Sequence, residues 1–224
     1  MYRIDLHTHS RFFHWFEGRP TAFDKFGFRL NVAVARTRGL DGIAVTNHDY
    51  YTNIDVDTGD MSIIPGIEIS TTEGHLLVVG PDPPEQTLSG AMSPEEAASL
   101  ARNRGCAVVM AHPFRSGTVK DSGVAVDAIE VNGKHPNTAP MIEVLAGDRN
   151  LPLVGGSDAH YPIEIGRVIT TIEADELTPE SVVEAIQAGR TDYQTVTRFP
   201  DQYTERLYAA VHKLRYDRGD TSSH

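Results

Sequence analysis

Short apolar runs typical of β-strands alternate along this chain with segments of helical periodicity. The expected strands are residues 2–6, 42–46, 62–69, 75–80, 106–111, 128–131, 153–155 and 168–172, and the expected helices are residues 31–38, 93–104, 139–146, 178–189 and 203–216. Strands that alternate with helices favour parallel βα units and an α/β fold. About seven such units within roughly 200 residues indicate a barrel rather than an open sheet.

Two local signals sharpen these expected elements. Ser93, Pro94 and Glu96 form a capping-box pattern with proline at the first helical position, so a helix should begin there. Pro65 lies inside the expected strand 62–69. Because proline lacks a backbone N–H, this position indicates an edge strand or a bend.

Composition and charge exclude several classes of protein. The 224 residues carry 20 Lys and Arg against 31 Asp and Glu, a formal net charge of −11. No apolar run approaches the ~18 residues of a membrane span, and the N-terminus lacks the apolar region of a secretory signal. The single cysteine, Cys106, excludes an internal disulfide. We therefore expect a cytoplasmic protein that binds neither a membrane nor an extended nucleic acid.

The chain shows no internal repeat and no low-complexity block. Residues 1–200 are expected to form one catalytic domain, and residues 201–224 are expected to add a helix and a frayed tail to the same domain.

Seven of the ten histidines fall at or just beyond the end of an expected strand, or in the loop that follows it. They are His7, His9, His14, His48, His75, His112 and His160. Glu68 and Asp158 occupy similar positions. The C-terminal ends of parallel strands gather at one face of a barrel, so these side chains should converge. His75 differs from the other histidines of this set, because it lies at the start of its expected strand and not at the end.

The residue types in this set favour a metal site. His7 and His9, like Asp158 and His160, are two residues apart and therefore point to the same side of an extended segment. Glu68 lies in an apolar stretch, where an unpaired carboxylate is costly and calls for a cation. The alternatives are histidines satisfied in the core and a salt bridge from Glu68 to an arginine. Imidazole and carboxylate ligands without thiolate suit Zn, Mn or Fe, and their number suffices for two or three divalent ions.

Six motifs resemble those of the PHP (polymerase and histidinol phosphatase) family, and they occur in the family's order. They are Asp5-Leu6-His7-Thr8-His9-Ser10, Thr46-Asn47-His48-Asp49, Gly66-Ile67-Glu68-Ile69-Ser70, Ala111-His112-Pro113, Ile129-Glu130-Val131 and Gly156-Ser157-Asp158-Ala159-His160. The resemblance implies a distorted (β/α)7 TIM-like barrel with a two- or three-metal site at the C-terminal face of the strands. It also implies a ligand set: His7, His9, Glu68 and Asp158 for a first ion; Glu68, His75 and His112 for a second; His14, His48 and His160 for a third.

The chain departs from the family pattern at two positions near the implied third ion. His14 stands where the family often has an aspartate, and Asn47 stands where aspartate is common before the histidine. Histidine is a fair substitute as a ligand, whereas Asn47 removes a charge. The aromatic run Phe12–Phe16 is also unusual, and either a wall over the site or local packing explains it.

The activity that the resemblance implies is metal-dependent hydrolysis of a phosphate ester, in which a water activated by the ions attacks phosphorus. Because a guanidinium matches a phosphate edge, Arg115 and Arg11 are the expected phosphate contacts. Lys134 and the neighbouring His135 follow an expected strand and are further candidates for contact with substrate. Asp158 or His160 is the candidate to pass a proton to the leaving oxygen. The expected partner is a small phosphorylated substrate, with a nucleotide among the options.

Three other functions stay open. An amidohydrolase-type barrel that cleaves C–N bonds also begins with His-x-His, although Glu68 at the bridging position and the Gly156–His160 motif argue against it. A nuclease that acts on nucleotide or oligonucleotide ends is a second alternative. A non-catalytic metal-binding or regulatory module is the third, and the presence of all nine candidate ligands argues against that reading.

Overall fold

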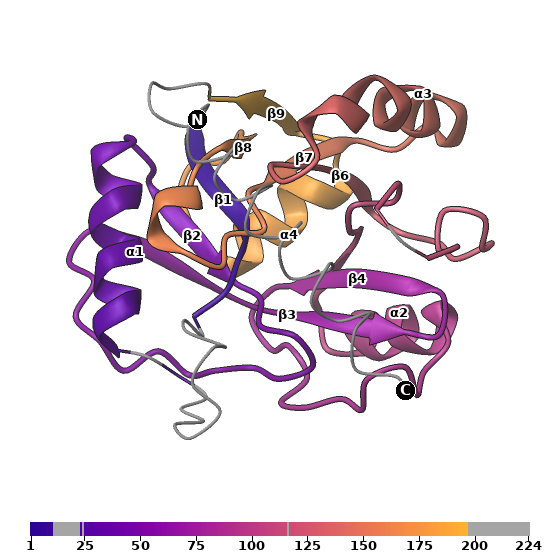
Figure 1. Ribbon diagram of the computed structural model, residues 1–224, viewed down its shortest axis with the longest axis horizontal. Helices are drawn as coiled ribbons and strands as arrows, with labels where there is room; N and C mark the ends of the chain where they lie inside the picture. Colours follow the sequence, from indigo (N-terminus) through magenta and orange to yellow (C-terminus); the bar gives the residue numbers. More distant parts are fainter. Residues whose placement is uncertain (11–22, 24, 116, 197–224) are drawn as a thin grey trace, which may run out of the picture.

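The computed structural model describes residues 1–10, 23, 25–115 and 117–196, and these residues form nine strands, four α-helices and two short 3-10 helices (Figure 1). The strands are β1 (Tyr2–Thr8), β2 (Gly42–Val45), β3 (Ser62–Thr71), β4 (Gly74–Val79), β5 (Ala107–Met110), β6 (Ala128–Asn132), β7 (Leu153–Gly156), β8 (Val168–Ile172) and β9 (Thr191–Thr195). The helices are α1 (Lys25–Thr37), α2 (Pro94–Asn103), α3 (Ala139–Arg149) and α4 (Pro179–Gln187), with η1 (Pro136–Thr138) and η2 (Pro162–Glu164).

The strands form one sheet in the order β7-β6-β5-β4-β3-β2-β1-β8-β9, and this sheet curls into a nearly closed barrel. The segment after β7 returns to the end of β1, where His9 N–H donates to the Ala159 carbonyl at 2.9 Å. Gly155 in β7 approaches β8 so closely that a Cβ atom there would meet the Ile169 carbonyl. A side chain at Gly155 would therefore oppose the closure of the barrel.

The α/β barrel-like architecture is confirmed, but the expectation of seven parallel βα units is not met in detail. β1–β2, β2–β3, β5–β6 and β6–β7 are parallel pairs. β3–β4, β4–β5, β1–β8 and β8–β9 are antiparallel. β4 follows β3 through a tight turn with no room for a helix, and a connection that short can only join antiparallel strands.

Several expected boundaries are reproduced. Ser93 Oγ accepts the Glu96 N–H and Glu96 Oε2 accepts the Ser93 N–H, which is the capping box at the start of α2. Pro65 marks a bend rather than an edge, because β3 pairs with β2 up to Pro65 and with β4 from Gly66 onward. The missing N–H of Pro65 therefore falls where the strand changes partner.

Other elements differ from the sequence expectation. α1 begins at Lys25, six residues before the expected start at Asn31, and β9 was not expected. β9 is polar and carries no apolar run, so its pairing with β8 left no signal in the sequence. The expected helix 203–216 lies outside the described residues.

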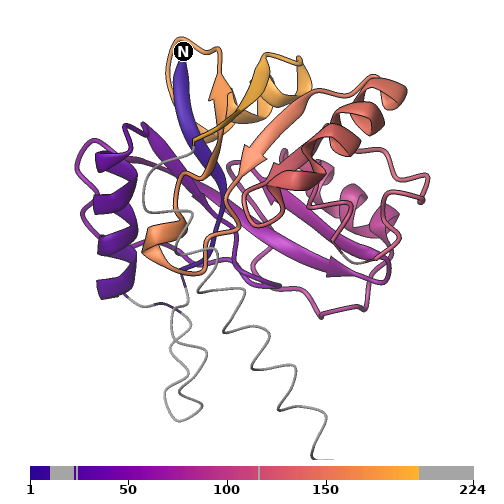
Figure 2. The same cartoon turned by 45° about the horizontal axis from the view of Figure 1, so that its top comes forward.

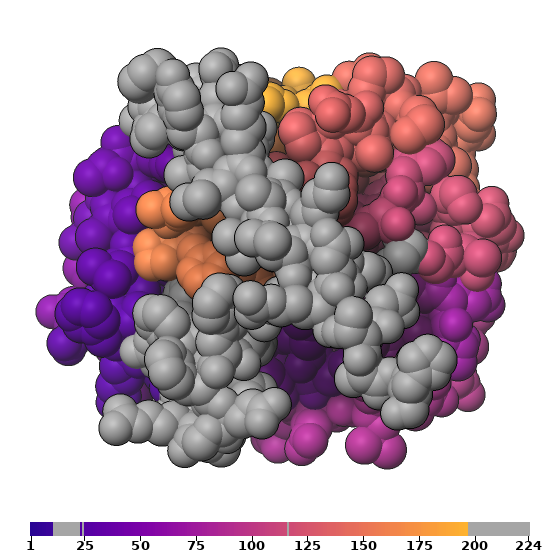
Figure 3. Space-filling view, in the orientation of Figure 1, coloured from indigo at the N-terminus to yellow at the C-terminus, as the bar shows by residue number. Residues whose placement is uncertain are grey.

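Helices cover the outside of the barrel and one of its two ends. α1, α2 and α3 lie outside the sheet, as the turned view shows (Figure 2). α1 and α3 occupy opposite sides of the space-filling face (Figure 3). Val182 and Ile186 of α4 pack in one apolar cluster with Ala107, Ala128 and Val154, which lie near the starts of their strands. α4 therefore covers the N-terminal end of the barrel and leaves the C-terminal end for polar side chains.

Among the described helices, none combines the length and the apolar character that crossing a membrane requires.

Candidate metal centre

Five histidines surround one buried carboxylate at the C-terminal end of the barrel. Glu68 lies in β3 with no exposed surface. The ring nitrogens nearest to its two oxygens are His75 Nδ1 at 2.7 Å, His7 Nε2 at 2.9 Å, His112 Nε2 at 3.0 Å, His48 Nδ1 at 3.2 Å and His9 Nε2 at 3.4 Å. These histidines come from β1, β4 and the loops after β1, β2 and β5. The convergence predicted from the strand ends is thus present.

His75 reaches the cluster by the antiparallel turn between β3 and β4. Ser70 pairs with His75, and Glu68 lies two residues before Ser70 on the same face of the strand. The start of an antiparallel strand lies at the same edge of the sheet as the end of the strand before it. A histidine that opens its strand therefore still faces the site.

A second buried carboxylate, Asp158, lies beside Glu68 and carries different partners. Arg115 Nη1 lies 2.9 Å from Asp158 Oδ2, and Lys134 Nζ lies 3.0 Å from Asp158 Oδ1. Lys134 Nζ also lies 2.7 Å from His160 Nδ1. The structure therefore brings Arg115 and Lys134 to Asp158 and His160 from two other parts of the sequence.

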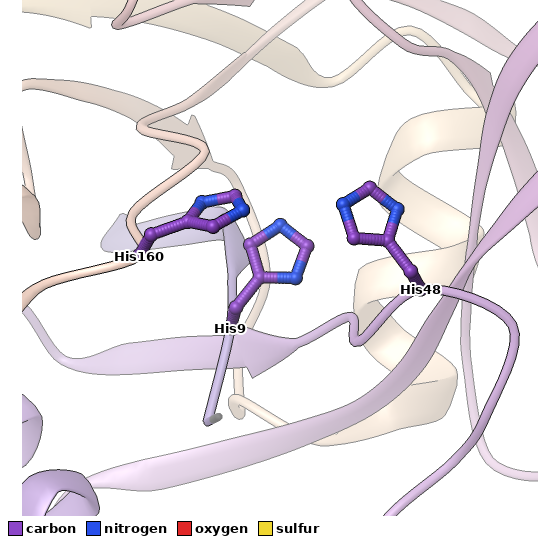
Figure 4. A group of neighbouring side chains, drawn as sticks. All are labelled: His9, His48 and His160. Atoms are coloured by element: carbon purple, nitrogen blue, oxygen red, sulfur yellow. The ribbon is translucent and has the colours of Figure 1, made fainter. Parts of the chain in front are cut away.

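The three rings of His9, His48 and His160 lie close together, with His9 between the other two (Figure 4). Ring centroids lie 4.2 Å apart for His9 and His160 and 4.7 Å apart for His9 and His48. Among the residues that the structure describes, this group is one of four sets of three ligand atoms that lie within 4.8 Å of one another. The others are His7, His9 and Glu68; His7, His112 and Asp158; and His48, Glu68 and His75.

Charges within the cluster favour ionised carboxylates. Burial alone would raise the pKa of Glu68, but His7 and His48 outweigh it and hold that pKa well below its usual value. Burial also opposes the shift at Asp158, where His7 and Lys134 hold the pKa well below its usual value. Two adjacent carboxylates thus stay negative, which is the condition for binding a cation.

The histidines divide into two groups by protonation. Burial, reinforced by His160, lowers the pKa of His9 well below its usual value. Burial likewise lowers the pKa of His48. Burial opposes protonation of His7 as well, but Glu130 and Glu68 raise its pKa well above the usual value. His9 and His48 are therefore neutral near pH 7 and offer lone pairs to an ion.

An unsatisfied nitrogen tests whether a metal ion fits these residues. His9 Nε2 is buried and makes no hydrogen bond to any residue that the structure describes. It lies 3.3 Å from Asp158 Oδ1 and 3.4 Å from Glu68 Oε2. A neutral ring nitrogen directed between two carboxylates lacks a proton donor, and a divalent cation satisfies all three groups at once. The donor set is nitrogen and oxygen without sulfur, which suits Zn, Mn or Fe.

Backbone strain is concentrated in the same place. His112 has φ +28° and Asp158 has φ +52°, and Asp49, next to His48, has φ +60°. Non-glycine residues adopt such angles at a cost of about 1–3 kcal/mol each. Strained residues of this kind cluster at functional sites, where the surrounding structure holds them in place.

Two supporting carboxylates were not assigned a role from the sequence. Glu130 in β6 accepts hydrogen bonds from the His7 ring and the His112 N–H. Asp5 accepts the N–H groups of His7, Ser157 and Gly166. Burial raises the pKa of Asp5 to about 6, against the lowering by its hydrogen bonds. The signal that singled out Glu68, a carboxylate inside an apolar strand, also applied to Glu130.

The structure changes the interpretation of Asn47. Its side chain is buried, accepts the Ser10 N–H at 2.8 Å and donates to Thr52 Oγ1 at 3.1 Å. Asn47 therefore also holds the segment after β1, and its predicted effect on the charge beside a third ion stays a prediction. Arg11, His14 and the run Phe12–Phe16 lie outside the described residues, so their predicted roles stay predictions.

Comparisons with known proteins agree with this geometry. The PHP-associated family model matches residues 141–191. No curated protein matches the chain. Thirteen solved chains match, and PsfC from Pseudomonas syringae is similar over 93% of this chain and 98% of its own, with a TM-score of 0.72 at 20% identity.

Two further solved structures are larger than this chain. A two-domain protein of Bacteroides vulgatus, which contains a predicted PHP-like metal-dependent phosphoesterase, has a TM-score of 0.60 at 23% identity over 87% of this chain and 64% of its own. A lesion-specific endonuclease from Pyrococcus furiosus has a TM-score of 0.58 at 18% identity, over 86% of this chain and 57% of its own. The resemblance to the PHP family is thus confirmed, and the chain has the fold of PHP-like metal-dependent phosphoesterases.

Proposed function

We propose that this protein is a metal-dependent hydrolase of the PHP type that cleaves a phosphate ester. The observation that carries the proposal is the convergence of five histidines on Glu68, beside an Asp158 that pairs with Arg115 and Lys134. Imidazole and carboxylate groups supply ligands for metal, and the cations supply partners for phosphate. A site for hydrolysis of an anionic ester needs both.

The residues that would hold two or three divalent ions, Zn, Mn or Fe, are His7, His9, His48, Glu68, His75, His112, Asp158 and His160, with His14 as a further candidate. When bound, the ions would activate water as a nucleophile and neutralise charge on the phosphate oxygens. Glu68 is the natural bridging ligand, since its two oxygens face different histidines: His75 and His112 contact Oε1, and His7, His9 and His48 lie nearest Oε2.

Arg115 and Lys134 are the proposed phosphate ligands. Arg115 uses one terminal nitrogen on Asp158, and its remaining N–H groups can engage a phosphate edge. Lys134 Nζ has three donors, of which Asp158 and His160 occupy two directions. Arg11, two residues beyond His9, is proposed as a third phosphate contact. The substrate is proposed to be a small phosphorylated molecule, with nucleotides among the candidates and no extended nucleic acid.

His160 is the proposed proton donor to the leaving oxygen, a role open to it only while it holds no ion. Asp158, the other candidate from the sequence, is held ionised by His7 and Lys134 and is the weaker choice. The contact of His160 Nδ1 with Lys134 Nζ, at 2.7 Å, supports this assignment because Lys134 is a proton source next to the ring. Lys134 thus orients His160 and holds a positive charge near the departing group.

A phosphate-release assay tests the function. The purified protein would be incubated with Mn²⁺, Zn²⁺ or Fe²⁺ and a panel of histidinol phosphate, nucleotides, nucleoside 3′,5′-bisphosphates and sugar phosphates. Release that requires metal and disappears in His9→Ala is the expected result. Metal binding without release from any substrate would refute the small-molecule phosphatase and favour the nuclease or C–N hydrolase, which oligonucleotide and amide substrates then separate.

A further inference from the structure

Glu130 is a second fully buried glutamate at the centre, and it contacts two candidate metal ligands from behind. Its Oε1 lies 2.7 Å from His7 Nδ1. Its Oε2 accepts the backbone N–H of His112 at 2.9 Å and the side-chain amide of Asn132 at 3.2 Å. Glu130 has no exposed surface, and all its contacts are with buried groups.

The contact with His7 determines which ring nitrogen faces the metal centre. A carboxylate at Nδ1 keeps the proton on that nitrogen, because a carboxylate only accepts hydrogen bonds when ionised. Nε2, which lies 2.9 Å from Glu68 Oε2, is then the nitrogen that faces the metal site, and an ion bound there would replace any proton shared with Glu68. A carboxylate behind a histidine also raises the basicity of the ring as a ligand.

The contact with His112 acts through the backbone. His112 has φ +28°, a conformation that a non-glycine residue rarely adopts. The hydrogen bond from its N–H to Glu130 helps to hold that conformation, in which His112 Nε2 lies 3.0 Å from Glu68 Oε1. His7 and His112 approach different oxygens of Glu68, so Glu130 supports both sides of the bridging carboxylate.

Gly156 leaves the space that this arrangement needs. A Cβ atom on Gly156 would collide with Glu130 Oε1 and would lie 2.5 Å from His7 Cβ. Neither the buried carboxylate nor the strand that carries His7 can move away easily. Gly156, the first residue of the Gly156–His160 motif, is therefore needed for Glu130 and His7 to lie this close together.

We propose that Glu130 is a positioning residue that fixes the Nδ1-protonated form of His7 and the backbone of His112, and thereby sets metal affinity on both sides of Glu68. This inference depends on the metal site proposed above. Glu130 is not itself a ligand in this proposal, because its two oxygens already contact His7, His112 and Asn132.

Asp127, three residues before Glu130 in the chain, provides a matched control. Asp127 Oδ2 accepts the Val108 N–H at 2.7 Å, so it is also a carboxylate that joins the β5 and β6 region through a backbone hydrogen bond. It lies at the opposite end of β6 from the histidines. A purely structural role for Glu130 predicts that Glu130→Ala and Asp127→Ala behave alike.

The experiment measures Zn²⁺ affinity by calorimetry for the native protein, Glu130→Ala and Asp127→Ala. Glu130→Ala should weaken Zn²⁺ binding by about 10–100-fold, the usual effect of losing a partner of a ligating histidine. Asp127→Ala should leave it unchanged. Equal Zn²⁺ affinity in the two variants would overturn the inference. If Glu130→Ala does not fold, Glu130→Gln keeps the side-chain volume and should still weaken binding by about tenfold.

A proton NMR measurement on the metal-free protein separates failure of this inference from failure of the proposed function. The His7 Nδ1 proton should appear as a downfield, slowly exchanging signal in the native protein and in Asp127→Ala, and it should be lost in Glu130→Ala. If the native protein binds no Zn²⁺, the proposed metal site fails and this signal alone decides the role of Glu130. Absence of the signal from the native protein would refute the positioning role.

Discussion

Glu68 and Asp158 are both fully buried carboxylates, but their counter-charges are of different kinds. Glu68 is surrounded by imidazoles, whose charge depends on pH and on bound metal. Asp158 faces the guanidinium of Arg115 and the ammonium group of Lys134 instead. The charge of Glu68 is therefore fully balanced only when a cation is added, whereas Asp158 already has two cationic side chains beside it.

The largest expected effect is at Glu68. Glu68→Gln removes the charge shared by five histidines, so it should abolish binding of the bridged ions and lower the rate of phosphate release by more than about 100-fold, beyond the effect of losing a supporting residue. Metal content by elemental analysis and phosphate release measure this. Glu184→Gln, which changes an exposed glutamate paired with Arg190, is the control. Retention of both metal and activity in Glu68→Gln would contradict the central role of Glu68.

A smaller effect of a different kind is expected on the Asp158 side. Arg115→Ala should lower kcat/KM by about 10–100-fold through loss of a charged partner for phosphate, while the metal content stays unchanged. Arg190→Ala, at the exposed Glu184 pair, should change neither quantity. If Arg115→Ala instead loses metal, the task of Arg115 is to hold Asp158 in place rather than to bind substrate.

The pH dependence of stability in the metal-free protein should reflect the titratable partners of Glu68. His9 and His48 have lowered pKa values, so the unfolded chain takes up protons that the native state does not, and stability should fall as pH drops below about 6.5. Burial opposes protonation at His7 and His75, but nearby carboxylates raise the pKa of both. The stability that these two rings contribute should be lost as pH rises above about 6.5.

Urea unfolding in the presence of a chelator at pH 5, 6.5 and 8 measures this dependence. The free energy of unfolding should be greatest near the middle pH. His48→Gln should flatten the acidic side of the profile and leave the alkaline side alone. A profile that rises steadily from pH 5 to pH 8 would show that the native protein does not hold His7 and His75 protonated.

The smallest effect is expected at Asn47. Asn47→Asp keeps the oxygen that accepts the Ser10 N–H but loses the amide N–H groups that donate to Ser10 Oγ and Thr52 Oγ1. Stability should fall by about 1–3 kcal/mol, the usual net value of two hydrogen bonds, with little change in metal affinity. Thermal unfolding and calorimetry with Zn²⁺ measure the two quantities. A gain in metal affinity would mean that residue 47 does influence the charge at the ions.

The barrel and the identity of the cluster were predictable because both depend on repeating signals. Apolar runs indicated the strands. Histidines at the ends of those strands indicated that their side chains converge, as they do around Glu68. The direction of β4 was not predictable from periodicity, since strands of either direction have the same alternation. β9 left no signal because a polar strand at the end of the sheet needs no apolar residues.

The supporting residues were harder to predict than the ligands. Glu130 and Asp5 act through backbone N–H groups and ring nitrogens of segments that are remote in the sequence. The sequence of residues 128–132 does not show that Gly156, in another strand, leaves room for the Glu130 carboxylate. The pairing of Lys134 with both Asp158 and His160 likewise depends on the closure of the barrel, which no local pattern specifies.

The turn between β3 and β4 makes part of the site sensitive to chain length. Thr71 pairs with Gly74 across a turn of two residues, and this register places His75 on the face that carries Glu68. Adding or removing one residue would shift the pairing by one position and send the His75 ring to the opposite face of the sheet. A single codon inserted at this turn would therefore remove a proposed metal ligand from the site while leaving every histidine in the sequence.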